Sequence, residues 1–199
     1  MLSIRPASRF DLHLHSDRSD GRYAPDEVLA RCARGGLDVV ALTDHDLGSA
    51  VPTGLHRIEG RDLYVLGGAE VSGMHDGREH HLLVYFPGEV PDGFRTFCRE
   101  QCRARAVRYE RALENLGLAD VVAPPDADAR DGGRALTRFH LARELVARGR
   151  ATNQRDAFAR FVGDAHGTVP RLTLPLVEAI RIARAYGGLT SWAHPPTAT

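Results

Sequence analysis

The sequence is organised around residues 10–21, which read FDLHLHSDRSDG. Apolar and polar residues alternate from position 10 to position 15, which predicts a strand that ends in turn-forming residues. Successive strand side chains point to opposite faces, so His13 and His15 share one face. Two such imidazoles can bind one metal ion, and the carboxylates of Asp17 and Asp20 follow within reach. The alternative is a surface strand that carries two histidines by chance.

The composition is that of an ordinary globular protein. A chain of 199 residues with 43% hydrophobic residues can form one domain, or one domain with an insertion. The 26 basic and 26 acidic residues cancel, so net charge does not favour binding to nucleic acid or a membrane. The three cysteines are a small and odd number, which argues against a disulfide framework. No apolar stretch has membrane-spanning length. We therefore expect a cytoplasmic protein, with no membrane association and no DNA-binding motif.

Four further segments have the pattern of strands, and most of them lead to a polar residue of interest. They are residues 37–43 before Asp44-His45-Asp46, 63–69 before Glu70, 79–86 containing His81, and 189–194 ending at His194. A predicted helix at residues 24–34 separates the first two strands of the chain, which favours parallel pairing. Parallel strands bring their C-terminal ends to one rim, where α/β barrels hold their active sites.

The middle of the chain is predicted to be helical. Helices are expected at residues 93–116, 137–148, 156–162 and 174–186, with Thr137 as an N-cap and a polar loop at 124–133. This gives three parts: residues 1–92 as the N-terminal part of a barrel, 93–186 as a helical insertion, and 187–199 as a further barrel strand. The predicted fold class is α/β, an incomplete, distorted (β/α)7 TIM-like barrel with a helical insertion.

The candidate metal ligands combine imidazoles with carboxylates. They are His13, His15, Asp20, His45, Glu70, His81 and His194. Such a ligand set suits Mn²⁺, Zn²⁺ or Fe²⁺, and a carboxylate such as Glu70 can bridge two ions. A metal-bound water would serve as the nucleophile, and the sequence has neither a Gly-rich phosphate loop nor a Gly-x-Ser-x-Gly motif. His80 competes with His81 for the site, because alternation lets only one of them face it.

Six motifs in order resemble those of PHP-domain (polymerase and histidinol phosphatase) phosphoesterases. They are DLHLHS with SDG at 11–21, ALTDHD at 41–46, GAEVS at 68–72, HLLVYF at 81–86, RFHLARELV at 138–146 and SWAHP at 191–195. In the fifth motif Phe139 replaces the proline that is usual in the family. The chain is most similar to the branch of ribonuclease AM-type 5′-3′ exoribonucleases and nucleoside 3′,5′-bisphosphate or AMP phosphatases.

The resemblance implies a site with two or three divalent ions, Mn²⁺ being the favoured metal. His13, His15 and Glu70 would hold one ion and the catalytic water; Glu70, His81 and His194 a second; Asp20 and His45 a third. Arg138 and His140 would bind the substrate phosphate. The implied substrate is a small phosphorylated nucleotide or a short RNA.

The family closes its site with an Asp-x-His motif on a later barrel strand, and no such motif follows His194 in these 199 residues. The sequence therefore leaves two alternatives open, a fragment of a longer protein and a truncated, non-catalytic metal-binding remnant. A histidinol-phosphate-type phosphatase is an alternative activity. Amidohydrolases, which also place His-x-His on a first barrel strand, are a further one, although the residues around Asp20 and His45 favour a phosphoesterase.

Overall fold

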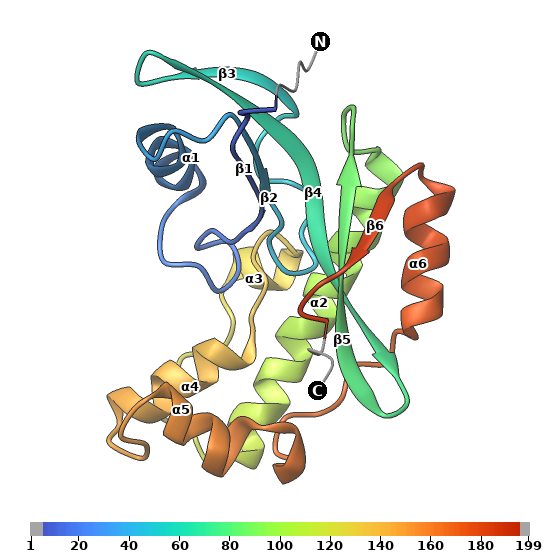
Figure 1. Cartoon of the computed structure of the whole chain (residues 1–199). Helices are drawn as coiled ribbons and strands as arrows, with labels where there is room; N and C mark the ends of the chain where they lie inside the picture. The colour runs from blue at the N-terminus through green and yellow to red at the C-terminus, as the bar shows by residue number, and fades with distance from the viewer. Residues whose placement is uncertain (1–5, 196–199) are drawn as a thin grey trace.

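A computed structural model describes residues 6–195 and shows a six-stranded sheet covered by helices (Figure 1). The strands follow the order β1-β2-β4-β5-β6, and β3 pairs with β4 beside this path. Their bounds are β1 Phe10–Leu14, β2 Val39–Leu42, β3 Gly54–Ile58, β4 Arg61–His75, β5 Arg78–Phe86 and β6 Leu189–Trp192. The α/β class predicted from the sequence is confirmed, but the sheet is open.

The first part of the sheet is parallel, as predicted. β1 pairs with β2 and β2 pairs with β4, both in parallel, and helix α1 (Pro25–Arg34) connects the first two strands. Pro25 lies in the first turn of α1, where the missing N–H costs nothing. Leu29 of α1 is buried in one cluster with Leu42 of β2 and Val65 of β4. This packing holds the C-terminal ends of β1 and β2 together at one edge.

The second part of the sheet is antiparallel, and here the expectation of parallel strands is wrong. β4 pairs antiparallel with β3 and β5, and β5 pairs antiparallel with β6. Two-residue turns make the hairpins: Glu59 and Gly60 have φ of 49° and 77°, and Asp76 and Gly77 have 46° and 71°. Positive φ at both central residues matches the twist of paired strands, so these turns force the chain straight back. β3 was not predicted from the sequence.

The β4–β5 hairpin places Glu70 within a strand, whereas the sequence predicts it at a strand end. The predicted strand ends at residue 69, whereas β4 continues to His75 because residues 67–75 pair with β5. Glu70 pairs with Leu83 in the middle of this ladder and is not at a strand end. β2 ends at Leu42, and an isolated parallel bridge joins His45 to Glu70, whereas β4 continues to His75.

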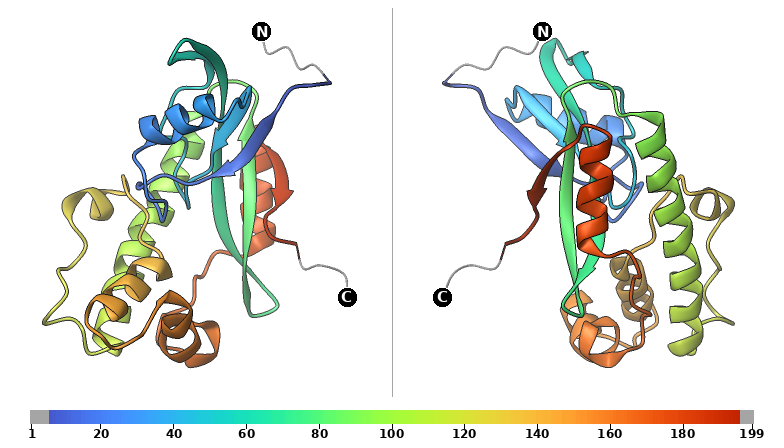
Figure 2. Two further views of the ribbon diagram at one scale, coloured as in Figure 1. Left: turned by 60° about the vertical axis from the view of Figure 1, so that its left-hand side comes forward. Right: turned by 90° about the vertical axis from the view of Figure 1, so that its right-hand side faces the viewer.

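Two helices pack on the antiparallel part of the sheet (Figure 2). They are α2 (Asp92–Asn115) and α6 (Leu176–Ala185). Phe94 and Cys98 of α2, together with Ala183 of α6, are buried in one cluster with Val71 and Val84 of the sheet. The N-terminal half of α2 is therefore part of the core of the sheet.

The C-terminal half of α2 packs with shorter helices into a second cluster. These are α3 (Ala127–Asp131), α4 (Arg138–Ala147), α5 (Gln154–Ala157) and the turn η1 (Phe158–Val162). The 3₁₀ turn η2 (Asp164–His166) follows η1 and has no buried residue. α3 forms inside the segment predicted as a loop, where Asp126 caps it by accepting from Ala129 N at 2.9 Å. The predicted helix 156–162 is instead the end of α5 followed by the π-helical turn η1. No helix among residues 6–195 is long and apolar enough to cross a membrane.

Candidate metal centre

Glu70 lies at the centre of the polar cluster and has no exposed surface. Five imidazoles surround its carboxylate. The distances to its oxygens are 3.2 Å from His13 Nε2, 3.0 Å from His15 Nε2, 3.0 Å from His81 Nδ1, 3.4 Å from His45 Nδ1 and 3.7 Å from His194 Nε2. The structure therefore brings every histidine proposed from the sequence as a ligand to one carboxylate.

The ligand atoms fall into three groups, each with its atoms within 4.8 Å of one another. They are His13-Glu70-His194, His15-Asp20-His45 and His45-Glu70-His81. Asp20 joins the second group through Oδ1, 3.4 Å from His15 Nδ1, and Oδ2, 3.3 Å from His45 Nε2. His15 reaches this group through Nδ1, and its Nε2 also lies 3.0 Å from Glu70 Oε2, the oxygen that His13 Nε2 approaches at 3.2 Å.

The donor set fits divalent transition ions. Imidazole nitrogens and carboxylate oxygens at these separations can converge on one ion after small rotations. The Nδ1 atom of buried His45 has no hydrogen-bond partner among the described residues, although Glu70 lies 3.4 Å away. A buried polar atom without a partner is costly, so its place in the cluster suits a metal ligand.

Opposite charges tune the protonation of the cluster. Burial by itself raises the pKa of Glu70, but the adjacent imidazoles of His13, His15 and His81 outweigh it and hold the pKa well below its usual range. Burial of Asp20 is likewise outweighed by its hydrogen bond to His45, and its pKa falls to about 2. Burial of His81 is outweighed by Glu70 and Glu79, which raise its pKa to about 9. The carboxylates are therefore in the charged form that cations bind.

Asp44 holds the loop that follows β1. Its carboxylate accepts from Ser16 N at 2.7 Å, from Ser16 Oγ at 2.6 Å and from Ser19 Oγ at 2.5 Å. Ser19 Oγ is also 3.3 Å from His15 Nδ1. Asp44 thus fixes the ligand-bearing turn from the neighbouring strand end, a role that the sequence analysis did not assign.

Asp46 and Arg105 make a second buried connection behind the cluster. The Nε atom of Arg105 donates to Asp46 Oδ2 at 2.5 Å, and its Nη2 atom donates to Ser72 Oγ at 2.6 Å. Asp46 Oδ1 accepts from Ser72 N at 2.9 Å. Helix α2 thereby joins the segment around His45 to the strand that carries Glu70. Nothing in the sequence separates Arg105 from the other arginines of this helix.

The helices contribute arginines on the opposite side. A small cavity is lined by Asp20, His45 and His81 from the cluster, and by Arg105, Arg108 and Arg138 from α2 and α4. Arg138 pairs with Asp164 at 2.5 Å, and Arg108 pairs with Glu79 at 2.9 Å. Permanently charged guanidinium groups next to a cation site are suited to a phosphate.

His140 serves first as part of a helix cap. Thr137 N donates to His140 Nδ1 at 3.1 Å, and Phe139 N donates to Thr137 Oγ1 at 3.2 Å, which confirms Thr137 as the N-cap. Burial and the nearby Arg143 lower the pKa of His140 to about 4. Of the two adjacent histidines, His81 faces Glu70, whereas the ring of His80 lies 5.5 Å from that of Trp192.

A sheet with a cluster of histidines and carboxylates at its strands is typical of α/β proteins with a metal site. Comparisons with known proteins identify the family within that class. The PHP domain family matches residues 11–114, just over half of the chain. A 5′-3′ exoribonuclease Rnm from Salmonella typhimurium is 30% identical over 190 residues, covering 94% of this chain and 65% of that protein. A 3′,5′-nucleoside bisphosphate phosphatase from Chromobacterium violaceum is 30% identical over 195 residues, covering 94% of this chain and 67% of that protein.

A solved structure supports the fold. A candidate metal-dependent phosphoesterase from Bifidobacterium adolescentis superposes with a TM-score of 0.73 at 24% identity, covering 98% of this chain and 70% of that one. This chain belongs to the PHP domain family. It spans about two thirds of the length of the curated relatives described above.

Proposed function

We propose that this protein is a metal-dependent phosphoesterase that hydrolyses phosphate esters of nucleotides, such as 3′,5′-bisphosphates and AMP, or acts at RNA 5′ ends. The observation that carries the proposal is the convergence of five imidazoles and Asp20 around the fully buried Glu70. The relatives named as an exoribonuclease and a bisphosphate phosphatase support the class of substrate.

The three groups of side chains support the assignment of the ligands. His13, His15, Asp20, His45, Glu70, His81 and His194 would hold two or three divalent ions, with Mn²⁺ as the first candidate and Zn²⁺ or Fe²⁺ as alternatives. A divalent ion supplies positive charge to the phosphate oxygens and lowers the pKa of a coordinated water. Glu70, which belongs to two of the three groups, is the residue suited to link two ions.

The chain's own side chains account for the binding and orientation of the phosphate. Arg138 and Arg108 line the small cavity next to His45 and His81, so their guanidinium groups can donate to phosphate oxygens there. His140 is the second proposed phosphate contact, and its low pKa keeps the imidazole neutral at pH 7. A neutral imidazole can still donate one hydrogen bond.

We also propose the architecture that the family resemblance implies. The open sheet would be part of an incomplete, distorted (β/α)7 barrel, with residues 1–92 and 187–199 contributing strands and residues 93–186 forming the helical insertion. The parallel pairing of β1, β2 and β4 supports the barrel, and the all-helical segment between β5 and β6 supports the insertion.

The function is tested by phosphate release from adenosine 3′,5′-bisphosphate with and without Mn²⁺, with the metal content measured on the same sample. We expect release that needs the metal, stops with a chelator and disappears in His13→Ala. His56→Ala is a matched control, because His56 is half-buried on β3 and hydrogen-bonds to Pro52 O, outside the cluster. A folded, metal-loaded protein that releases no phosphate would contradict the proposal.

A further inference from the structure

Glu79 is a charged side chain next to the metal centre that is not one of the proposed ligands. It lies on β5, two residues before His81, so the two side chains share one face of the strand. The Glu79 side chain is 7% exposed. Burial of an unpaired carboxylate is costly, so the partners of Glu79 indicate its role.

The two oxygens of Glu79 contact different parts of the site. Oε1 lies 3.4 Å from Nε2 of His81, whose other ring nitrogen, Nδ1, is 3.0 Å from Oε1 of Glu70. Oε2 accepts from Nη2 of Arg108 at 2.9 Å, and Nη2 of Arg138 lies 3.9 Å from the same oxygen. Glu79 therefore contacts a proposed metal ligand through one oxygen and two proposed phosphate-binding arginines through the other.

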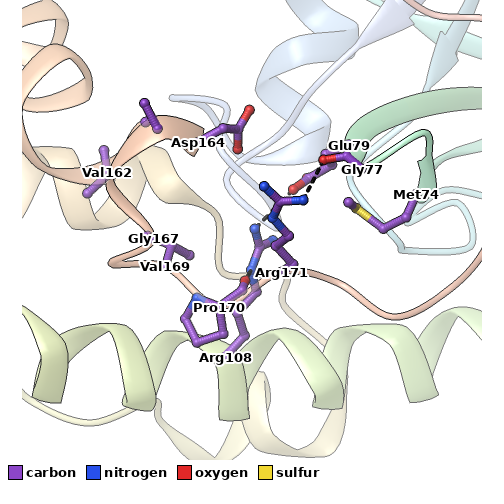
Figure 3. Close-up of a pocket in the computed structure, with 12 residues that line it drawn as sticks. Met74, Gly77, Glu79, Arg108, Val162, Asp164, Gly167, Val169, Pro170 and Arg171 are labelled. Atoms are coloured by element: carbon purple, nitrogen blue, oxygen red, sulfur yellow. Dashed lines mark hydrogen bonds and ion pairs between the residues drawn. The ribbon is translucent and has the colours of Figure 1, made fainter.

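Arg108 is held at this position by a second contact. Its Nε donates to the carbonyl oxygen of Pro170 at 2.5 Å, and its side chain is 11% exposed. Glu79 and Arg108 line both the small cavity that contains His45 and His81 and a larger cavity of about 380 Å³ (Figure 3). The ion pair therefore forms a common wall of the two cavities.

The contacts of His81 decide which of its ring nitrogens is available to a cation. A neutral imidazole has one N–H and one free lone pair, and the hydrogen bond made by one nitrogen sets the role of the other. Glu79 is paired with the permanently charged Arg108, so it is ionised and can only accept. With Nε2–H donated to Glu79, Nδ1 is the nitrogen left for an ion beside Glu70.

We propose that Glu79 is a positioning residue, which fixes His81 as the Nε2–H tautomer with Nδ1 toward Glu70 and holds Arg108 beside the phosphate position. This inference rests on the proposed function and deepens it, because one carboxylate orients both a metal ligand and a phosphate contact. Carboxylates that hydrogen-bond to a metal-binding histidine fix its ring and its tautomer, and their loss lowers metal affinity about 10–100-fold.

The first test is nitrogen NMR of the protein labelled with isotopic histidine and loaded with Zn²⁺, a diamagnetic ion. This measurement does not depend on turnover. We expect the ring of His81, identified by the signals that disappear in His81→Ala, to carry its proton on Nε2 and to bind the ion through Nδ1. A ring that carries its proton on Nδ1 would overturn the proposal.

The second test is Glu79→Gln. The amide has one acceptor oxygen where the carboxylate has two, so it cannot accept from both His81 and Arg108. We expect metal titration to show at least one Mn²⁺ ion bound about 10–100-fold more weakly. Calorimetry in saturating Mn²⁺ should also show weaker binding of inorganic phosphate. Asp76→Asn, which removes an exposed charge from the same hairpin, should change neither affinity.

A third variant separates the two contacts of Glu79. Arg108→Gln removes only the partner on the phosphate side, so inorganic phosphate should bind more weakly while the affinity for Mn²⁺ is unchanged. An unaltered affinity for Mn²⁺ in Glu79→Gln would overturn the proposal, and if that variant does not fold, the tautomer of His81 in the parent protein decides. A parent protein with the expected tautomer that releases no phosphate from nucleotides would count against the proposed function alone.

Discussion

The sheet and the helices contribute to the site in different ways. On the sheet side, His13 and Glu70 belong to strands whose backbones are hydrogen-bonded to their neighbours, and Glu70 is fully buried. On the helical side, Arg138 and Arg108 are held by ion pairs with Asp164 and Glu79. The sheet thus fixes the groups that we propose as cation ligands, while the helices supply the permanent charges that we propose as phosphate contacts.

This comparison predicts that the largest loss follows from a change on the sheet side. Glu70→Gln removes the negative charge that five imidazoles surround. We expect the affinity for Mn²⁺ to fall by more than about 100-fold, because loss of a residue that only hydrogen-bonds to a ligand already lowers metal affinity about 10–100-fold. The measurement is metal titration followed by elemental analysis. Retention of full metal occupancy would show that Glu70 is not a ligand. Glu59→Gln, at an exposed turn, is the control.

The connection between the two sides comes next. Arg105→Met leaves the carboxylate of Asp46 buried without its partner, which should lower the free energy of unfolding by about 3–5 kcal/mol. Urea denaturation measures this change. Arg105→Lys should lose less, because it retains a positive charge. Arg103→Met, exposed on the same helix, should stay within about 0.5 kcal/mol of the parent.

A smaller effect is expected where the sheet orients its ligands indirectly. Asp44→Asn replaces one of the two carboxylate oxygens with an amide donor, so the side chain can no longer accept all three hydrogen bonds from Ser16 N, Ser16 Oγ and Ser19 Oγ. We expect metal affinity to fall about 10–100-fold while the fold persists. Metal titration and circular dichroism test this. Unaltered affinity would mean that the turn after β1 does not depend on Asp44.

The smallest effect should come from the helical side. Thr137→Ala removes the side-chain cap of α4 and should cost about 1 kcal/mol in unfolding free energy, whereas Thr137→Ser should retain most of it. Thermal denaturation measures the difference. Metal affinity should be unaffected in both variants. A fall in metal affinity would contradict the idea that the sheet alone supplies the metal ligands and the helices supply only the phosphate contacts.

The sequence identified the histidines and carboxylates that cluster in the structure because their signals are local. The alternation around His13 and His15, and the histidines placed next to buried strands, depend on nearest neighbours along the chain. The parallel pairing of β1, β2 and β4 was predicted for the same reason, since a helix separates the first two strands. Strand β3 and the antiparallel pairing of β3, β4 and β5 were not predicted, although the turns Glu59-Gly60 and Asp76-Gly77 both carry glycine at the second position.

The sequence by itself determined the residue types of the cluster, the family and the helical character of residues 93–186. Only the tertiary structure decided how the ligands divide into three groups, that β4 runs on past Glu70, and that Arg105 closes the site from behind. The ligand groups and the Arg105 contact join residues far apart in the chain, such as Asp46 and Arg105 at 59 positions or Glu70 and His194 at 124, and such contacts depend on how sheet and helices pack. β4 runs on past Glu70 because residues 71–75 pair with residues 78–82 of β5.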